Sequence, residues 1–157
     1  MISLVRIDNR LIHGQVVQAW VPFLCAERIL VVDDQAATNP LVRACMELCV
    51  PPDVKVDVAA VEATDFQKLS ADKEKLLVLV RDVADVVRAR EHGLPVSSVN
   101  LGNVHFADGR AQVSPSVFLS PEEVRELERL ASDGVQIEVR ALPKDRPLGM
   151  DEIASKV

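Results

Sequence analysis

The chain has 157 residues, a length that fits one domain and is too short for two ordinary ones. Its 24 acidic and 18 basic residues give a net charge of −6, which excludes the basic surface typical of nucleic-acid-binding proteins. Hydrophobic residues make up 48% of the chain, which excludes disorder, and no apolar run approaches the roughly 20 residues of a membrane span. Because the first residues also lack the features of a signal peptide, we expect a single cytoplasmic domain over residues 1–157.

Short runs rich in β-branched residues alternate with helical patterns along the whole chain. In chain order we predict a strand at Ile2–Ile7, a helix at Gln15–Ala26, a strand at Ile29–Asp33, a helix from Pro40 to Cys49, strands at Val54–Ala59 and Leu76–Val80, a helix at Asp82–His92, strands at Val96–Leu101 and Ser116–Leu119, a helix at Pro121–Ser132 and a strand at Gln136–Arg140. This alternation predicts an α/β fold with a doubly wound, mainly parallel sheet of about six to seven strands and helices on both faces.

Two of the helices have clear start signals. Asn39 and Pro40 provide an N-cap and a proline in the first turn, and Ser120–Glu123 forms a capping box. The apolar positions of the helix after Asn39 are Leu41, Val42, Cys45, Leu48 and Cys49. Their helical spacing predicts that this face is buried, with the thiols packed as small apolar groups. An odd number of cysteines favours a reducing compartment over a disulfide scaffold.

The fold class predicts where a site for chemistry lies. In doubly wound sheets, ligands bind beyond the carboxyl ends of the strands, near the point where the strand order reverses. The segments that follow predicted strands in this way are Asp8–Gly14, Asp33–Thr38, Arg81–Asp82 and Gly102–Val113. The last of these is the longest predicted loop, and long loops in compact domains are often functional.

The segment Asp8–Gln15 is the most informative, because it follows the first strand and opens the first helix. His13 lies at that helix start, where the positive helix end favours anions and keeps the imidazole neutral and nucleophilic. Gly14 allows close approach of the backbone, and Arg6 and Arg10 can donate charge-assisted hydrogen bonds to phosphate oxygens. A nucleophilic histidine among anion donors is suited to accepting a phosphoryl group. From the spacing alone, a histidine that only caps the helix remains an open alternative.

Two adjacent aspartates at the end of the second predicted strand are a further candidate. Asp33 and Asp34 either orient His13 or Arg10 through hydrogen bonds, or simply terminate the strand. Clustered aspartates also suggest a receiver domain, which needs an acceptor aspartate at the end of a central strand and a lysine at the end of a later one. Asp57 lies inside its predicted strand and no lysine ends a later strand, so a receiver domain is excluded.

The remaining chemically interesting side chains favour structural roles. We expect His92 and His105 at the surface, and Trp20 in the core because it shares a helical face with other apolar residues. The histidines and cysteines do not have metal-ligand spacing, so no metal site is predicted. The chain has neither a P-loop nor a dinucleotide-binding glycine motif, so no cofactor is predicted.

The strings RIDNRLIHGQVVQAW, ILVVDDQAATNP and NLGNVHFADGR together resemble the IIB subunits of the mannose/fructose/sorbose family of the bacterial phosphoenolpyruvate-dependent sugar phosphotransferase system. The resemblance covers essentially the whole chain and implies the same doubly wound fold. It implies that His13 is the phosphohistidine intermediate of a protein-N(pi)-phosphohistidine–sugar phosphotransferase. His13 would accept the phosphoryl group from a phosphohistidine of a IIA partner and pass it to a sugar bound by the membrane IIC and IID subunits. The chain would then be cytoplasmic and peripheral at the inner face of the membrane.

Two positions depart from the family pattern. Asn9 stands where the family usually has aspartate, and Asn103 follows Gly102 where many members have paired glycines. These changes alter the charge and the backbone freedom expected around the phosphate, to which Arg110 is a further candidate donor. The residues that we group with His13 as phosphate-binding or active-site residues are Asp8, Arg10, Gly14, Gln15, Asp33, Asp34, Gly102 and Asn103.

Two other functions remain open at this point, namely a regulatory phosphocarrier of an incomplete phosphotransferase system and a small-molecule binding module without turnover. For the phosphocarrier we expect the loops Asp33–Thr38 and Gly102–Val113 to frame His13 and to touch both partners in turn, with Ala36 and Ala107 exposed. A homo-oligomer is left open, since no heptad seam marks an interface.

Overall fold

The computed structural model describes residues 1–157 and contains a seven-stranded sheet and a separate two-stranded sheet. The strands of the large sheet are β1 (Ile2–Asp8), β2 (Arg28–Val32), β3 (Lys55–Ala59), β4 (Leu76–Val80), β5 (Ser98–Asn103), β8 (Gln136–Val139) and β9 (Leu148–Gly149). The small sheet consists of β6 (Ala111–Ser114) and β7 (Val117–Leu119). The helices are η1 (Val16–Trp20, a π-helix), α1 (Val21–Leu24), α2 (Asp34–Ala37), α3 (Pro40–Leu48), α4 (Phe66–Ala71), α5 (Val83–Glu91), α6 (Pro121–Ser132) and α7 (Met150–Ala154). None of these helices has the length and hydropathy that a membrane span requires.

The order of the strands across the large sheet is β3-β2-β4-β1-β5-β8-β9. The chain first moves outward from β1 to β2 and β3, returns to place β4 beside β1, and continues with β5 and β8 on the other side. All neighbours among β1 to β5 and β8 are parallel, and only β9 runs antiparallel, beside β8. The predicted doubly wound, mainly parallel sheet is therefore confirmed. The direction of winding reverses at β1, which is where a ligand site is expected.

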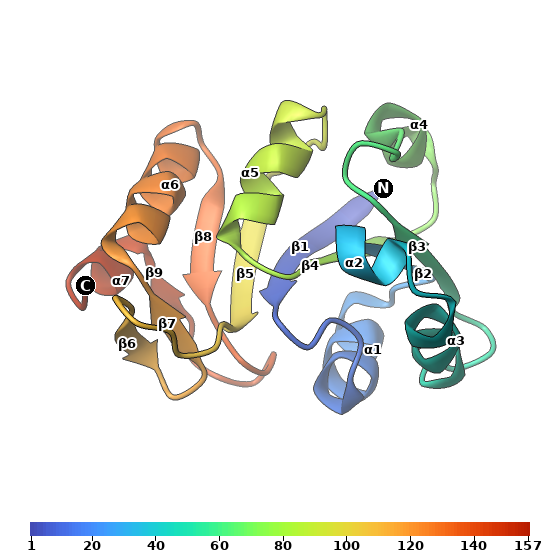
Figure 1. The fold of residues 1–157 in the computed structure, drawn as a ribbon, viewed down its shortest axis with the longest axis horizontal. Helices are drawn as coiled ribbons and strands as arrows, with labels where there is room; N and C mark the ends of the chain where they lie inside the picture. Colours follow the sequence, from blue (N-terminus) through green and yellow to red (C-terminus); the bar gives the residue numbers. More distant parts are fainter.

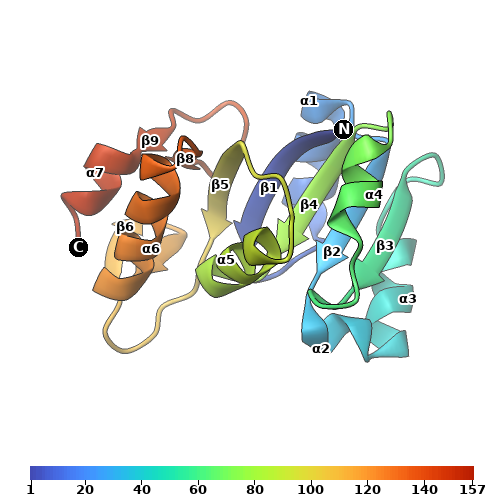
Figure 2. The same cartoon turned by 90° about the horizontal axis from the view of Figure 1, so that it is seen from above.

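Helices cover both faces of the large sheet (Figure 1, Figure 2). η1, α1 and α3 lie on one face, whereas α4, α5 and α6 lie on the other. The central strand β4 is buried throughout, and its side chains alternate between two cores. Val78 packs in the core with Val86 of α5, and Leu77 packs in the core that holds Trp20. The predicted core position of Trp20 is confirmed.

The two start signals found in the sequence form as expected. The Asn39 side chain accepts hydrogen bonds from the N–H groups of Leu41 and Val42, each at 3.2 Å, and so caps α3. At the start of α6, Ser120 Oγ accepts from the N–H of Glu123 at 3.2 Å, and Glu123 Oε2 accepts from the N–H of Ser120 at 2.9 Å. These reciprocal bonds satisfy groups that a helix start would otherwise leave without partners.

Several short elements differ from the prediction. The run Ser116–Leu119 does form a strand, β7, but this strand lies outside the large sheet. It pairs with β6 in a hairpin that occupies the end of the segment Gly102–Val113, which was predicted to be one long loop. The apolar residues of this hairpin, Val113 and Val117 among them, join the core on the α6 side. The predicted loop Asp33–Thr38 contains α2, and α4, β9 and α7 were not predicted at all.

The prediction that the apolar face of α3 is buried is wrong. Only Met46 is fully buried on this helix, while Cys45 and Cys49 are exposed, and Leu41 and Leu48 are 73% and 86% exposed. α3 lies at the outer edge of the molecule, beside the edge strand β3, so only one narrow side of the helix meets the sheet (Figure 1). Helical spacing of apolar residues therefore identified the helix correctly but assigned its outward face to the core.

Candidate active site

His13 lies where β1 gives way to the first helix, at the carboxyl edge of the sheet. After Asp8 the chain makes a tight turn, in which the N–H of Leu11 donates to the Asp8 carbonyl at 2.9 Å and Leu11 adopts a left-handed conformation with φ of 57°. The helix then begins, and its first backbone hydrogen bond runs from the N–H of Val17 to the His13 carbonyl at 3.1 Å. Because Leu11 and Ile12 are buried, the turn is anchored and holds His13 at a defined place on the rim.

Asp8 is completely buried and connects His13 to two arginines. Its Oδ2 lies 2.8 Å from His13 Nε2 and accepts a hydrogen bond from Arg6 Nη2 at 3.1 Å. Its Oδ1 accepts from Nε and from the backbone N–H of Arg10, at 3.2 and 3.1 Å. The structure therefore brings Asp8, Arg10 and His13 together, with the carboxylate behind the imidazole ring.

The charge of Asp8 determines which nitrogen of His13 faces outward. Burial by itself raises the pKa of the Asp8 carboxyl, but the hydrogen bond from His13 and the charge of Arg6 outweigh it and hold this pKa below its usual value. Asp8 is thus a carboxylate at neutral pH, and the proton that it shares with His13 resides on Nε2. Nδ1 has no partner within the chain and is not among the buried polar atoms, so it contacts solvent. In the neutral ring with this tautomer, the lone pair is at Nδ1.

Groups able to donate to an anion belong to residues next to His13 in the chain. The N–H groups of Gly14 and Gln15 have no acceptor within the chain, because Val17 donates the first backbone bond of the helix. The Arg10 side chain is 38% exposed, and its Nη2 donates to Gln15 Oε1 at 3.1 Å. Gly14 is exposed, with no atom within 4 Å of the position that a Cβ would occupy. Arg10, Gly14 and Gln15 thus share the rim with His13.

Arg6 does not reach the rim, contrary to the expectation that it contacts phosphate. Side chains alternate along β1, so Arg6 points to the same face as Asp8 and is completely buried under η1. Its guanidinium donates to Asp8 and to Asn100 Oδ1, and its Cζ lies 4.9 Å from the centroid of the Trp20 ring. Desolvation lowers the pKa of Arg6, and the Asp8 carboxylate opposes this effect. Arg6 therefore stabilises the Asp8 carboxylate from the interior of the protein, through a buried ion pair.

Gly102 covers the buried Arg6 guanidinium. A Cβ added to Gly102 would overlap the guanidinium nitrogens and Cζ of Arg6. Arg6 cannot swing away cheaply, because it is completely buried and its hydrogen bonds hold Asp8 and Asn100. Gly102 therefore acts through close packing on the charged network, and not as a direct neighbour of His13.

We expect Gly102→Ala to lower the free energy of unfolding by about 3 kcal/mol or more, because the new methyl group displaces a buried ion pair. Urea unfolding followed by circular dichroism measures this change. Gly14→Ala is the matched control and should change stability little, because its Cβ meets open space. Equal stabilities of the two variants would contradict the packing role of Gly102.

Asn9 ties the turn after β1 to the neighbouring strand ends. Its N–H donates to the Asn103 carbonyl at 3.0 Å, its Nδ2 donates to the Arg81 carbonyl at 2.8 Å, and its Oδ1 accepts from the N–H of His105. An aspartate here could not donate to Arg81, so the asparagine changes the connections of the loop as well as its charge. Asn103 takes part through its backbone, while its Nδ2 is buried without a partner. The structure does not bring the Asn103 side chain into hydrogen-bond contact with His13.

Asp33 and Asp34 form ion pairs away from the imidazole. Asp33 accepts from Arg81 Nε at 2.7 Å and Nη2 at 3.0 Å, and it caps α2. Asp34 accepts from Arg88 Nη2 at 2.9 Å. Neither aspartate contacts His13. Of the two interpretations that the sequence left open, the structure favours the one in which this pair ends the strand and starts a helix.

Asp85, whose carboxyl lies near this pair, has an unusual pKa. Burial, together with the nearby charges of Asp82 and Asp33, raises the pKa of Asp85 to about 6, although Arg88 opposes the shift from 3.4 Å. The side chain is 15% exposed. Its ionised form is therefore disfavoured in the folded chain relative to the unfolded one.

We expect Asp85→Asn to stabilise the protein at pH 7 but not near pH 4. The destabilisation by Asp85 is absent below about pH 4, grows as the pH rises towards 6 and is complete above it, because the unfolded carboxyl ionises first. The gain at pH 7 should be about 1–3 kcal/mol in the free energy of unfolding. Urea unfolding at both pH values measures it. Asp151→Asn, an exposed first-turn aspartate of α7, should show no such pH-dependent gain.

The two loops expected to frame His13 differ in what they expose. Ala36 was expected to be exposed at the rim, but it is only 2% exposed because α2 packs it against the sheet. Ala107 is exposed, and next to it Phe106 is 66% exposed. Arg110 is not free for phosphate, since its Nε and Nη2 bind Glu123 at 3.0 and 2.6 Å. Helix α2 and the loop that follows β5 nevertheless lie at the same edge of the sheet (Figure 2).

Asn100 belongs to the support of the site and was not singled out from the sequence. It is completely buried in β5, accepts from Arg6, and donates through Nδ2 to Glu138 Oε1 at 2.9 Å and to the Arg140 carbonyl at 3.1 Å. The signal was available, because a single amide within an apolar strand needs buried partners. The sequence could not name those partners.

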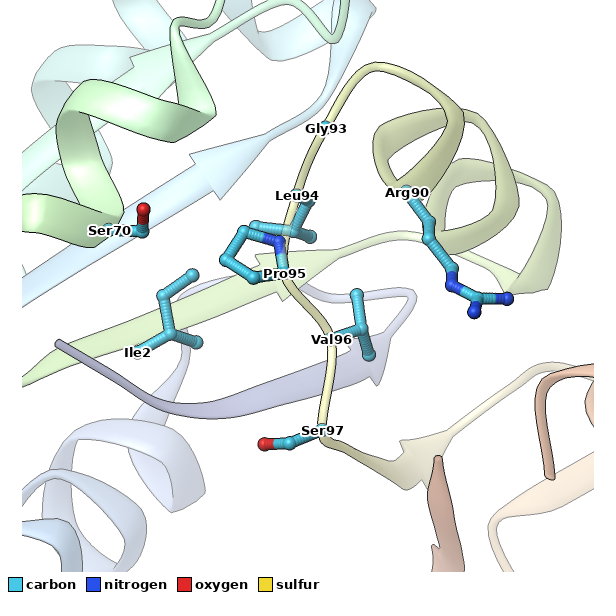
Figure 3. A pocket seen from close by; sticks show the side chains of 8 residues that line it. All are labelled: Ile2, Ser70, Arg90, Gly93, Leu94, Pro95, Val96 and Ser97. Carbon is cyan, nitrogen blue, oxygen red and sulfur yellow. The ribbon is translucent and has the colours of Figure 1, made fainter. Parts of the chain in front are cut away.

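A hollow of about 600 Å³ lies between the loop that follows α5 and the start of β1, and it contains none of these site residues. Figure 3 shows Ile2, Ser70 and Pro95 around it, with the Arg90 side chain directed away from them. Arg90 Nη1 instead donates to Asp133 at 2.6 Å. This hollow belongs to the opposite end of the strands and is separate from His13.

Comparisons with known protein sequences identify the family of the chain. Residues 2–157 match the family model described as the sorbose-subfamily IIB component of the PTS system. The chain is 32% identical over 146 residues to the fructose-specific EIIB component of Bacillus subtilis, covering 92% of this chain and 90% of that protein. It is also 32% identical over 160 residues to the mannose-specific EIIAB component of Escherichia coli, covering all of this chain and 49% of that protein.

Solved structures show the same fold. The IIB domain of the sorbose permease from Klebsiella pneumoniae matches with a TM-score of 0.88 and 26% identity, covering 100% of this chain and 98% of that one. The manxB structure from Thermoanaerobacter tengcongensis matches with a TM-score of 0.91 and 30% identity, covering 99% of this chain and 96% of that one. With the family model spanning nearly every residue, the chain belongs to the sorbose-subfamily IIB components of the phosphotransferase system.

Proposed function

We propose that this chain is a phosphocarrier for sugar uptake and that it carries the phosphoryl group on Nδ1 of His13. The observation that carries this proposal is the 2.8 Å contact between His13 Nε2 and the buried Asp8 carboxylate. With Nε2 engaged, Nδ1 is the nitrogen left with a lone pair and with access to solvent. The proposed intermediate is therefore N(pi)-phosphohistidine.

The proposed transfer step balances without a cofactor. The lone pair of His13 Nδ1 forms the new bond to phosphorus while the P–N bond to the donor imidazole breaks and returns its electron pair to the donor. Nε2 keeps its proton, so the phosphorylated ring carries a positive charge that the Asp8 carboxylate offsets. When the phosphoryl group leaves to a sugar hydroxyl, the hydroxyl proton goes to a base outside this chain and the ring becomes neutral again.

The phosphoryl oxygens find their donors on the same rim. The unpaired N–H groups of Gly14 and Gln15 and the half-exposed guanidinium of Arg10 are positioned beside His13. Donors aimed at the transferred group neutralise the charge on its oxygens, and this is the main protein contribution to phosphoryl transfer. Arg6, Asp33 and Asp34 take no part in this binding.

The partners follow from the family. The proposed donor is a phosphohistidine of a IIA protein or domain, and the Escherichia coli relative is itself an EIIAB component. The proposed acceptor is a sugar bound by membrane IIC and IID subunits, on which the chain docks at the inner face of the membrane. Because one rim must meet both partners in turn, each contact should be small and exchange rapidly.

Phosphorylation of the purified chain tests the function directly. After incubation with phosphoenolpyruvate, enzyme I, the phosphocarrier protein HPr and the cognate IIA, intact-mass measurement should show one added phosphate. The product should be labile in acid and stable in base, as phosphoramidates are, and ¹⁵N NMR should place phosphorus on Nδ1. No label, or a label on Nε2, would contradict the proposal.

We expect Ala107→Glu to slow phosphoryl arrival from IIA about ten-fold or more while leaving the thermal unfolding temperature nearly unchanged. Ala107 is exposed on the loop after β5, so the new charge meets the partner and no core atom. Rapid-quench labelling by phospho-IIA measures the rate. Arg129→Glu on the distant α6 is the control, and equal rates for both variants would show that the rim does not dock there.

A further inference from the structure

The turn that carries His13 is tied to distant parts of the chain through one residue. Residues 9–14 form hydrogen bonds to segments beyond this turn and its helix only through Asn9. The N–H of Asn9 donates to the Asn103 carbonyl at 3.0 Å, and its Oδ1 accepts from the N–H of His105. Its other two bonds both involve Arg81. Arg81 therefore provides half of the hydrogen bonds that hold the turn in place.

Asn9 and Arg81 hold each other at the ends of two neighbouring strands. Asn9 follows β1 and Arg81 follows β4, and these strands pair in parallel with Ile7 opposite Val80. Asn9 Nδ2 donates to the Arg81 carbonyl at 2.8 Å, and Arg81 Nη1 donates to the Asn9 carbonyl at 3.3 Å. The contact is thus reciprocal, and both of its bonds reach the turn after β1.

One of these bonds reaches the peptide group that binds the buried carboxylate of the site. The Asn9 carbonyl and the N–H of Arg10 belong to the same planar trans peptide, so they point in opposite directions. Arg81 Nη1 holds the carbonyl end, while Asp8 Oδ1 accepts from the N–H end at 3.1 Å. The other oxygen of Asp8 lies 2.8 Å from His13 Nε2. A rotation of this peptide therefore disturbs the carboxylate that orients His13.

Asp33 fixes the direction of the Arg81 side chain. Its carboxylate accepts from Arg81 Nε at 2.7 Å and from Nη2 at 3.0 Å, a two-point contact that sets the plane of the guanidinium. Nη1 is the nitrogen left over, and it is the one that reaches Asn9. Asp33 in turn is buried and accepts from the N–H of Ala36 at 2.7 Å. The Arg81 guanidinium is therefore anchored to a buried group.

Both members of this ion pair are charged at neutral pH. Burial raises the pKa of the Asp33 carboxyl, but the hydrogen bonds from Arg81 and from the N–H of Ala36 outweigh it and hold this pKa below its usual value. The hydrogen bond to Asp33 also raises the pKa of Arg81. The guanidinium is therefore a charge-assisted donor, which holds the Asn9 carbonyl more strongly than a neutral donor would.

We propose that Arg81 is a positioning residue for His13. Anchored by Asp33, Arg81 fixes the peptide that precedes Arg10, and this peptide orients the carboxylate behind the imidazole. No hydrogen bond joins Arg81 to His13, so Arg81 acts only through the turn. In-line transfer is slowed strongly when a reacting atom is misplaced by about 1 Å. The effect of Arg81 on transfer rests on the proposed function of His13, whereas its effect on the turn does not.

Hydrogen exchange of the unphosphorylated chain tests the hold on the turn. Arg81→Lys keeps a positive charge beside Asp33 but lacks the planar fork of the guanidinium. We expect the amides of Arg10 and Leu11 to exchange about ten-fold or more faster than in the wild type, relative to the amide of Val78. Val78 is buried in the centre of β4 and reports global unfolding, so a general loss of stability would accelerate all three amides alike. Unchanged relative exchange, measured by NMR, would overturn the proposal.

Phosphoryl transfer from phospho-IIA tests the consequence for the reaction. In Arg81→Lys the rate constant at saturating phospho-IIA should fall about ten-fold, while the half-saturating concentration stays within about two-fold of the wild-type value. Arg88→Lys is the matched control, because Arg88 pairs with the neighbouring Asp34 at 2.9 Å and does not contact the turn. It should change neither quantity. Equal rates for the two variants, or a change confined to the half-saturating concentration, would contradict the role of Arg81.

A double-mutant cycle tests whether Asp33 acts through Arg81. Asp33→Asn still accepts from the N–H of Ala36 but no longer offers two oxygens to the guanidinium, so it should slow transfer about as much as Arg81→Lys. The double variant should be no slower than either single variant, whereas independent effects would multiply to about 100-fold and contradict the proposal. A wild-type chain that takes up no phosphate would refute the proposed function instead, and the exchange of Arg10 and Leu11 would still decide the role of Arg81.

Discussion

A His13→Ala chain is expected to accept no phosphoryl group while it folds as the wild type does. The variant lacks the only imidazole that Asp8 holds at the rim, so no nitrogen lies beside Arg10 and the free N–H groups of the helix start. The loss of one hydrogen bond to Asp8 should cost about 1 kcal/mol in the free energy of unfolding, since both arginines still pair with that carboxylate. Intact mass after incubation with the phosphoryl donors and urea unfolding measure the two effects.

The other two histidines of the chain are the controls for this result. His92 and His105 are both exposed, as their positions in the sequence predicted. His92→Ala and His105→Ala should each still take up one phosphate. A label that persists in His13→Ala and disappears in His105→Ala would move the phosphorylated residue to the loop after β5.

Asp8→Asn is expected to damage both transfer and stability. The amide has the shape of the carboxylate but no charge, so it neither offsets the positive ring of phosphorylated His13 nor balances the buried Arg6. We expect the rate of phosphoryl transfer to fall at least about 100-fold, which corresponds to about 2.7 kcal/mol of barrier. Because Arg6 is left as an uncompensated buried charge, the free energy of unfolding should fall by about 3 kcal/mol.

The stability loss in Asp8→Asn should depend on pH. The pKa of Asp8 is lower in the folded chain than in the unfolded one, so its stabilisation is complete above about pH 4 and disappears as the pH falls further. The difference between Asp8→Asn and the wild type should shrink accordingly in acid. Asp108→Asn, an exposed aspartate in the loop after β5, is the matched control. If both variants lose equal stability and keep equal transfer rates, Asp8 is not the support of His13.

Most of the fold could be predicted because its signals are local. The all-apolar run of β4, the alternation of strands and helices, and the caps at Asn39 and Ser120 each depend on residues within a few positions of one another. The short elements α2, α4 and α7 have four to six residues each, too few for a periodic pattern to show. α3 shows a different limit, because its spacing indicates a helix but does not say which side meets the sheet.

The sequence by itself determined where His13 lies in the fold, because the end of β1, the tight turn and the helix start at His13 are consecutive in the chain. It also determined the winding of the sheet, since alternating strands and helices with short connections allow few other topologies. Only the tertiary structure decided that Asp8, and not Asp33 or Asp34, lies behind the imidazole. It also decided that Gly102 packs against the buried Arg6 guanidinium. Arg6 donates a hydrogen bond to Asn100, a residue 94 positions away along the chain. These contacts depend on which strands become neighbours of β1, and strand pairing is a long-range property that no local pattern of residues specifies.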